Sequence, residues 1–461
     1  MTEETYDVIV LGGGPGGVAA AVRASQLGGR VGLIEGETLG GFCMNRGCIP
    51  FGHMMIASNI LGGLPLGKEM GLDVKEVLKD YSALIKRQNG LIDFMRMGVS
   101  GTLAKNKIKI IKGKGRIAGS GKIEVDGQTF LFRKLILATG AKWLKPDFPG
   151  ADLEEVINSD DLLRLEALPK KVLLFGESPW LIEIAQFLNR YGTQVLLATK
   201  DKRILSMESQ TIASRLRKVL KGEGVEIKTQ AEIVAVMKKE DGAHVDLSSK
   251  DGAETVVVDR IIHLERAAAL KDLGLKTVHL DEEGPYIQVN DRMETRADGV
   301  YAVGDVTGDP SGHYSHRASE GGIIAAENAM GKKAFMNPKT MARILFTQPQ
   351  VACLGLTGKE AKGQGYDVMV GAAPFSVNPF GMIIAENEGI VEVVADKRFG
   401  EILGVHILGR NASEMVGQAV LAMQMEGTVE ELARASFPHP TLSESFAEAA
   451  REALGRPIYL P

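Results

Sequence analysis

The chain has 461 residues, of which 44% are hydrophobic and 24% are charged, and its formal net charge at pH 7 is −4. This length predicts two to four domains of ordinary globular composition, and the near-neutral charge gives no reason to expect nucleic acid or an acidic membrane as a partner. No apolar run reaches membrane-spanning length and the acidic N-terminus is unlike a signal peptide, so we expect a cytoplasmic protein without membrane insertion.

The N-terminal residues have the pattern of a βαβ nucleotide-binding unit. A buried strand, a helix and a second strand are predicted at residues 6–11, 18–27 and 31–35. The first connection carries a G-x-G-x-x-G motif, at Gly12, Gly14 and Gly17. We expect these glycines to allow, in turn, a tight turn, the approach of a pyrophosphate, and close packing of helix against strand. Glu35 ends the second strand, where a carboxylate can bind ribose hydroxyls.

Two of the three cysteines, Cys43 and Cys48, lie five residues apart in a glycine-rich stretch. In an ideal helix their Cα atoms would be roughly 8–9 Å apart, whereas a disulfide needs about 4.4–6.8 Å. A bridge would require a bent segment, which Gly40, Gly41 and Gly47 would allow. On cysteine usage alone, two reduced structural cysteines are favoured, because intracellular disulfides are rare unless they are catalytic or redox-sensing.

Later segments follow a similar α/β plan. We expect a long helix over 75–105, short strands at 107–111, 122–125 and 134–141, and a hairpin turn at Asp126 and Gly127. A second βαβ unit spans 171–198, but its turn keeps only Gly176 of the three glycines, with Ser178 and Leu181 at the other positions, and Thr199 instead of a carboxylate ends its second strand.

The C-terminal part mixes strands and helices. Strands are predicted at 299–305, 389–394 and 404–408, and the last helices at 412–425 and 442–453. Cys353 lies in an apolar run and is predicted to be a buried hydrophobe. No group of His and Cys residues has the spacing of a metal site, so no metal is predicted.

These motifs together resemble the FAD-dependent pyridine nucleotide–disulfide oxidoreductases, and above all their dihydrolipoyl dehydrogenase branch, nearly from end to end. The likeness is carried by the Gly12–Gly17 motif with Glu35 and by the stretches at 40–50, 138–141, 301–305, 347–351, 404–407 and 439–444. It implies an α/β fold with two Rossmann-like βαβ nucleotide-binding domains and a C-terminal α+β dimerisation domain. The implied divisions are an FAD-binding domain at 1–149, an NAD-type domain at 150–281, a central segment at 282–338 returning to the FAD domain, and a dimerisation domain at 339–461.

The resemblance also implies site residues. Cys43 would exchange with the substrate thiol and Cys48 would face the flavin, while His439 of the partner subunit would be the acid–base, oriented by Glu444. The implied FAD-binding residues are Gly12, Gly14, Pro15, Gly17, Glu35, Gly41, Phe42, Gly115, Ala138, Thr139, Gly140 and Asp305. Residues 441–444 also fit a capping box, so that Glu444 would only cap a helix and His439 would only occupy a loop.

Two departures from the family pattern change the predicted function. The family continues from its second cysteine as Ile-Pro-Ser-Lys, but here Phe51 and Gly52 follow Ile49 and Pro50, so the lysine is absent. Its expected partner, Glu183, would then be solvated, protonated or paired with another cation. The altered turn at 176–181 and the segment at 264–269, which lacks most of the family's Gly-Arg-x-Pro-Asn pattern, argue against ordinary NAD binding.

The resulting hypothesis is an FAD-dependent dithiol/disulfide oxidoreductase whose electron partner is a redox protein, a quinone or another flavoprotein rather than ordinary NAD. Its substrate would be a small-molecule or protein-bound dithiol, with lipoyl groups the commonest in the family. One alternative is an NAD(P)H-linked dihydrolipoyl dehydrogenase or disulfide reductase with an atypical nicotinamide site. For that alternative, the cations at Lys200, Lys202 and Arg203 would meet a 2′-phosphate, although a solvated loop is preferred. The other is a non-catalytic, FAD-bound regulatory homodimer.

Overall fold

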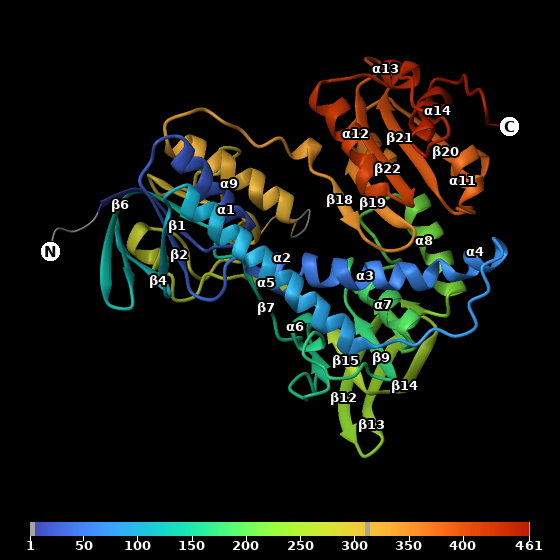
Figure 1. The fold of residues 1–461 in the computed structure, drawn as a ribbon, viewed down its shortest axis with the longest axis horizontal. Helices are drawn as coiled ribbons and strands as arrows, with labels where there is room; N and C mark the ends of the chain where they lie inside the picture. The colour runs from blue at the N-terminus through green and yellow to red at the C-terminus, as the bar shows by residue number, and fades with distance from the viewer. Residues whose placement is uncertain (1–4, 309–313, 461) are drawn as a thin grey trace.

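The computed structural model describes residues 5–308 and 314–460 and confirms the predicted α/β class. Figure 1 shows three bodies, each built around a sheet: the N-terminal body on the left, the second body below, and the C-terminal body at the upper right. The boundaries proposed at 149, 281 and 338 stay predictions. Within the described ranges, no helix combines the length and apolar character that crossing a membrane requires.

The first sheet places the expected nucleotide site at the carboxyl ends of its parallel strands. Its path is β3-β2-β1-β6-β5-β4, with β17 beside β6. The strands are β1 Thr5–Leu11, β2 Val31–Glu35, β3 Lys109–Lys112, β4 Gly115–Gly119, β5 Lys122–Val125, β6 Gln128–Leu137 and β17 Val300–Ala302. Because β1 is parallel to β2 and β6 and Leu11 pairs with Leu137, the chain leaves these strands side by side. Helices α1 (Pro15–Gln26) and α9 (Ser315–Ala329) pack against each other beside this sheet.

The hairpin predicted at Asp126 and Gly127 is confirmed, since both residues adopt positive φ between β5 and β6. The cysteine stretch forms two helices, α2 (Gly41–Arg46) and α3 (Cys48–Gly62), and α4 (Leu64–Glu69) follows. The helix expected over 75–105 is shorter: α5 spans Tyr81–Lys105, because Asp80 is extended and its Oδ1 caps the helix by accepting the Ala83 N–H at 2.9 Å.

The second body repeats the βαβ plan. Its sheet has the order β11-β10-β9-β15-β8, and an antiparallel sheet β12-β13-β14 lies beside it. The strands are β8 Val156–Ile157, β9 Lys171–Phe175, β10 Gln194–Thr199, β11 Glu226–Thr229, β12 Ala231–Lys239, β13 Gly242–Ser249, β14 Gly252–Val258 and β15 Arg260–His263. Its helices include α6 Ser159–Leu162, α7 Trp180–Tyr191 and α8 Gln210–Gly222. A small sheet joins β7 (Ala141–Trp143) to β16 (Arg266–Ala268).

The C-terminal body has an antiparallel sheet of order β18-β19-β22-β21-β20. Its strands are β18 Arg343–Leu345, β19 Gln350–Gly355, β20 Val368–Pro374, β21 Ile390–Asp396 and β22 Ile402–Gly409. Its helices are α10 Gly358–Gly363, α11 Pro379–Ile383, α12 Ala412–Gln424, α13 Val429–Arg434 and α14 Glu444–Ala453. The two predicted last helices are confirmed, whereas the sequence patterns do not predict α13, a short helix that begins with a capping box of Thr428 and Glu431.

Candidate active site beside the paired cysteines

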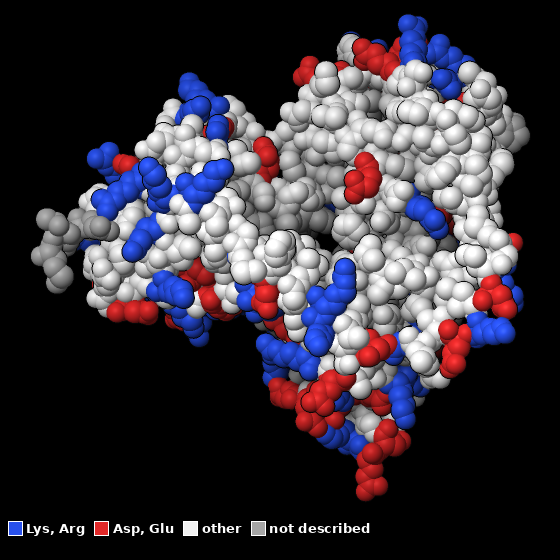
Figure 2. Space-filling view, in the orientation of Figure 1, with Lys and Arg blue, Asp and Glu red and all other residues white. Residues whose placement is uncertain are grey.

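A cavity of about 1850 Å³ lies where the parallel strands of the first sheet end. Its lining includes all the residues predicted to bind FAD except Gly17. It also includes both Cys43 and Cys48, and Glu183 from α7. Figure 2 shows a hollow between the N-terminal and C-terminal bodies in this region. The cavity therefore brings the glycine turn and the two thiols into one space.

The glycine turn leaves room for a ligand where the motif predicts it. Gly12 has φ +109°, and a Cβ there would lie 2.3 Å from the carbonyl oxygen of Ala138. A Cβ on Gly17 would lie 1.8 Å from the Gly12 carbonyl oxygen, so Gly17 allows α1 to approach β1 and does not line the cavity. A Cβ on Gly14 would meet only Gly41 Cα, at 3.8 Å, which leaves that side of the turn open. These features fit a pyrophosphate at the start of α1.

Two acidic residues flank the same cavity. Glu35 Oε2 accepts the Gly13 N–H at 2.6 Å, so this carboxylate stands beside the glycine turn. Asp305 forms an ion pair with Arg266 at 3.0 Å, and the Arg266 guanidinium lies 3.8 Å from the centre of the Phe42 ring. The sequence motifs predict Asp305 and Phe42 but give Arg266 no role. Arg266 begins a strand of the second body, so its contact with Asp305 cannot be derived from chain order.

The cysteine pair sits at a bend. Gly47 adopts φ −126° and ψ −112°, which ends α2 before α3 begins at Cys48. Both cysteines are free thiols, and both line the cavity. A hydrogen bond from the Cys48 thiol lowers the pKa of Cys43 to about 7, against the opposing effect of burial. The same hydrogen bond, together with burial, raises the pKa of Cys48. The reduced pair is thus about half ionised near neutral pH, and its negative charge is centred on Cys43.

The surroundings of Glu183 bear on whether it is solvated, protonated or paired with another cation in the absence of the lysine. Its side chain is buried, and its Oε1 accepts the Phe346 N–H at 2.8 Å. Among the described residues it has no ion pair with a lysine, arginine or histidine. Burial raises the pKa of Glu183 to about 8, although the Phe346 hydrogen bond acts in the opposite direction. Glu183 is therefore a neutral carboxylic acid at pH 7, which is one of the three outcomes considered.

We expect Glu183→Gln to make the protein relatively more heat-stable as the pH rises. A glutamate with a pKa near 8 in the native state binds a proton that the unfolded state, with a pKa near 4.5, has released. The stability of the wild type therefore falls between about pH 4.5 and pH 8, while glutamine does not titrate and retains a carbonyl for Phe346. The difference in Tm should widen by roughly 2–5 °C from pH 5 to pH 8. Glu166→Gln, at an exposed position, is the control; a constant difference at all pH values would contradict a neutral Glu183.

The second nucleotide-type turn differs from the first in what fills it. Glu177 and Ser178 line the large cavity, and a separate cavity of about 10 Å³, room for about one water molecule, lies between Gly176 and Thr199. Glu177 places a carboxylate in this turn, where its Oε1 accepts the Lys200 N–H at 3.3 Å. Arg203 donates to the backbone carbonyls of Ser206 and Glu208, whereas Lys200 and Lys202 are exposed. The geometry here does not match that of the first turn.

An aromatic cluster not predicted from the sequence lies beside the thiols. Trp180, the first residue of α7, makes edge contacts with Phe51 at 4.8 Å and with Phe42 at 5.6 Å between ring centroids. Trp143 makes a further edge contact with Phe42 at 5.5 Å. Phe51 stands where the family has serine, next to the position of the absent lysine. The region after Cys48 is therefore aromatic and apolar on one side.

His439 and Glu444 lie elsewhere on the chain. The Nδ1 of His439 is 3.0 Å from Glu444 Oε1, and Glu444 Oε2 accepts the Thr441 N–H at 2.9 Å. The Thr441 hydroxyl donates to Pro438 instead of capping the helix, so only half of the predicted capping box forms. One carboxylate thus contacts the His439 ring and accepts a backbone N–H at once. His439 is exposed and does not line the cysteine cavity of its own chain.

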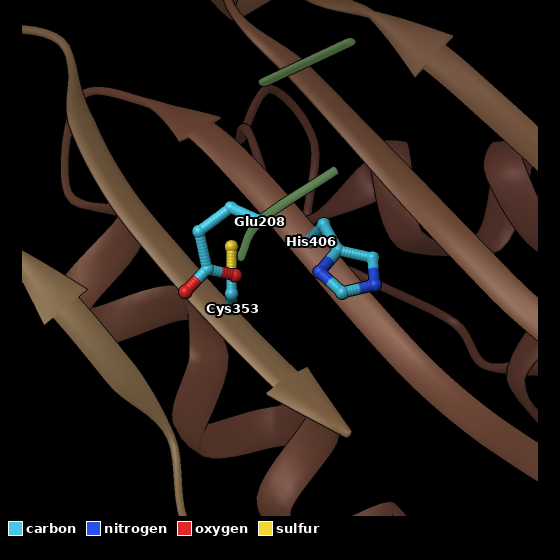
Figure 3. Close-up of side chains that lie close together, drawn as sticks. All are labelled: Glu208, Cys353 and His406. Atoms are coloured by element: carbon cyan, nitrogen blue, oxygen red, sulfur yellow. The ribbon is translucent and has the colours of Figure 1, made fainter. Parts of the chain in front are cut away.

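A buried cluster of Glu208, Cys353 and His406 is also absent from the sequence predictions. Figure 3 shows the three side chains facing one another, and their candidate ligand atoms lie within 4.8 Å of each other. Cys353 on β19 pairs in register with His406 on β22. Both oxygens of Glu208 already bind Arg343, at 2.7 and 2.9 Å, and this ion pair holds the pKa of Glu208 below its usual value despite burial. The prediction that Cys353 is buried is confirmed, and Arg343 supplies the charge that balances Glu208.

Comparisons with known proteins match almost the whole chain. The family model for pyridine nucleotide-disulphide oxidoreductases matches residues 6–332, and the model for their dimerisation domain matches residues 341–450. A dihydrolipoyl dehydrogenase of Thermus scotoductus is 39% identical over 454 residues, covering 97% of this chain and 97% of the relative. A dihydrolipoyl dehydrogenase of Bacillus subtilis is 31% identical, covering 98% and 99%.

Solved structures show the same fold. The LpdA protein of Mycobacterium tuberculosis superposes with a TM-score of 0.88 at 24% identity, covering 96% of this chain and 99% of that one. The HOCl-induced flavoprotein disulfide reductase RclA of Escherichia coli, solved as a Cu(II) complex, gives a TM-score of 0.85 at 24% identity, covering 97% and 99%.

Proposed function

The chain belongs to the pyridine nucleotide–disulphide oxidoreductase family, and on that premise we propose that it is an FAD-dependent dithiol/disulfide oxidoreductase acting through Cys43 and Cys48. The observation that carries this proposal is the thiol pair itself. The two sulfurs share a hydrogen bond inside the large cavity, and the pKa of Cys43 is lowered to about 7. A thiol that is half ionised at neutral pH is suited to thiol–disulfide exchange.

The cavity has the features that FAD requires. Gly12, Gly14 and Gly17 provide the turn, the open approach and the helix packing, and the start of α1 would receive the pyrophosphate. Glu35 would bind the ribose hydroxyls and Asp305 would lie beside another part of the cofactor. When bound, FAD would supply a two-electron acceptor and donor for the thiol pair.

The thiol chemistry assigns different tasks to the two cysteines. In the reducing direction the Cys43 thiolate attacks a substrate disulfide; in the oxidising direction a substrate thiolate attacks Cys43, and the electron pair of the broken bond leaves on Cys48. The substrate thiol must lose or gain a proton in each direction. We assign that proton to His439 of the partner subunit, whose Nδ1 is held by Glu444.

A homodimer accounts for the position of His439. The C-terminal match to the family's dimerisation domain supports it. Large apolar side chains are exposed on α3 and α5: Ile56, Ile60, Phe94 and Met97. Figure 2 shows few charged side chains over α3 and over the viewer-facing side of the C-terminal body, whose upper edge is charged. A second copy of the chain would cover this apolar surface.

We also propose that the protein is cytoplasmic and is not inserted in a membrane.

The electron partner is the less ordinary part of the proposal. Ser178 and Leu181 replace two glycines, Glu177 adds a negative charge to the turn, and Thr199 cannot hold a ribose as a carboxylate does. We infer a redox-protein, quinone or flavoprotein partner in place of ordinary NAD. The second candidate is an NAD(P)H-linked enzyme, which is favoured by the curated relatives named dihydrolipoyl dehydrogenase. Lipoyl groups are the first substrates to try.

We expect the oxidised protein, mixed without oxygen with dihydrolipoamide, to lose flavin absorbance or to develop a charge-transfer band. NADH and NADPH at the same concentration should produce neither change within the time in which the dithiol reacts. The measurement is stopped-flow absorbance of the flavin with each reductant. Fast reduction by NADH would support the second candidate instead. Failure of the dithiol to act on a flavin-loaded protein would favour a regulatory dimer and contradict the proposed activity.

A further inference from the structure

Cys48 has one polar neighbour to which neither the sequence nor the family comparison assigns a role. The Oγ of Ser315 lies 3.2 Å from Cys48 Sγ, within hydrogen-bonding range for sulfur, although the two residues are 267 positions apart. Ser315 is the first residue of the 15-residue helix α9 and lines the same cavity as the thiols. No acidic residue lies in the first turn of α9, so the partial positive charge at this end of the helix is not countered by a carboxylate of the helix's own first turn.

The position of Ser315 is fixed by the packing of α9 on α1. A Cβ on Gly16 would lie 2.8 Å from the Ala318 carbonyl oxygen, and a Cβ on Gly322 would lie 2.2 Å from the Gly16 carbonyl oxygen. These close backbone contacts hold the first turn of α9 against the helix that follows the glycine turn. Ser315 therefore reaches the thiols from a rigid element.

We propose that Ser315 is a catalytic residue of this site, whose hydroxyl donates a hydrogen bond to the Cys48 sulfur when thiol–disulfide exchange leaves negative charge there. This rests on the proposed function of the cysteine pair. A substrate thiolate forms a bond to Cys43 Sγ, the Cys43–Cys48 bond breaks, and its electron pair leaves on Cys48 Sγ. The substrate dithiol is the reductant, the protein disulfide is the oxidant, and the Ser315 proton stays on its oxygen. A stabilised leaving thiolate departs faster.

The surrounding charges make this hydroxyl important. Glu183 is neutral and lacks an ion-pair partner among the described residues, and the lysine expected after Cys48 is absent. Asp305 acts against a thiolate, because its carboxylate raises the pKa of Cys43. Ser315 acts in the opposite direction on both thiols: its hydrogen bond lowers the pKa of Cys43 and that of Cys48. The neutral Ser315 hydroxyl thus stabilises the negative charge on the thiols, which a nearby cation would otherwise stabilise.

The test compares Ser315→Ala, Ser315→Thr and Ser319→Ala in the flavin-loaded protein. Ser319 lies one turn further along α9 and provides the same substitution without a sulfur contact. Each protein is reduced with excess dithiothreitol, alkylated with iodoacetamide from pH 5 to pH 9, and analysed by mass spectrometry to follow Cys43 and Cys48 separately. In Ser315→Ala the alkylation midpoint of the pair should rise by about one pH unit, the equivalent of tenfold in thiolate stability. Threonine should restore it, and Ser319→Ala should not move it.

A second readout separates this inference from the proposed function. The rate of reduction of the Cys43–Cys48 disulfide by dihydrolipoamide should fall about tenfold in Ser315→Ala and recover in Ser315→Thr. Loss of reaction in the wild type, with the alkylation midpoint still shifted in Ser315→Ala, would overturn the proposed activity but leave the role of Ser315 at the thiols. An unchanged midpoint in a folded, flavin-loaded Ser315→Ala protein would overturn the inference. A threonine variant that behaved like the alanine variant would overturn it as well.

Discussion

Replacing either Cys43 or Cys48 by serine is expected to slow flavin reduction by dihydrolipoamide by roughly a thousandfold or more, because neither variant can form the disulfide that the dithiol attacks. Cys353→Ser is the matched control. Cys353 is fully buried in the C-terminal body and does not line the cysteine cavity, so its variant should react at the wild-type rate. The measurement is the anaerobic stopped-flow trace of each protein.

The two serine variants should differ from each other with an aromatic disulfide such as 5,5′-dithiobis(2-nitrobenzoic acid). Cys43 has its pKa lowered to about 7 by a donor that serine at position 48 can replace, whereas burial still raises the pKa of Cys48 after Cys43, the larger cause of that rise, is removed. Cys48→Ser should therefore release the coloured thiolate quickly and retain a mixed disulfide on Cys43, at a rate that rises through about pH 7. Cys43→Ser should react much more slowly. The reverse order would exchange the roles assigned to the two cysteines.

Local sequence patterns predict the first nucleotide turn well. Gly17 packs against the Gly12 carbonyl oxygen within the βαβ unit, a contact that the spacing of the motif requires. A bend is a condition for a disulfide between Cys43 and Cys48, and the chain does bend at Gly47. These features depend on residues close in sequence or on one well-known supersecondary unit, so spacing is sufficient to predict them.

Contacts between distant segments are beyond sequence reasoning. The sequence leaves three outcomes open for Glu183, and only its burial in the folded chain, beside the Phe346 N–H, decides among them. Trp180 belongs to the altered turn in the sequence, but its edge contacts with Phe42 and Phe51 require α7 to lie against the cysteine helices. A signal does exist for these residues: an aromatic residue, Phe51, stands in place of the family's serine after Cys48, and another, Trp180, lies in the altered second turn.

The C-terminal segment at residues 439–444 shows a different limit of prediction from sequence. From the sequence, a capping role for Glu444 and an orienting role toward His439 are alternatives. The carboxylate has two oxygens, and each takes one role: Oε1 faces His439 and Oε2 accepts the Thr441 N–H. The motif of a helix start and the motif of an acid–base pair are therefore compatible at one residue. Which chain's cysteines His439 serves is a question about the dimer, and it can be tested directly.

Replacing His439 by glutamine is expected to lower the rate of dithiol oxidation by about a hundred- to ten-thousandfold, the range for loss of a general acid–base. Glu444→Gln should have a smaller effect, because glutamine keeps an oxygen that can accept a hydrogen bond from His439 Nδ1. Both should bind FAD as the wild type does, since neither residue lines the cavity. The loss should appear in the pre-steady-state dithiol reaction, whatever the electron acceptor.

Mixing inactive subunits decides where His439 acts. Co-refolded or co-expressed Cys43→Ser and His439→Gln chains form heterodimers in which, if each site combines the cysteines of one chain with His439 of the partner subunit, one site carries both lesions and the other is intact. Random pairing makes half of the dimers mixed, so about a quarter of wild-type activity should return. If His439 served its own chain, every site in the mixture would carry a lesion and no activity would return. The activity of the mixture, and that of heterodimers purified through two different tags, therefore shows whether the site combines two chains or lies within one.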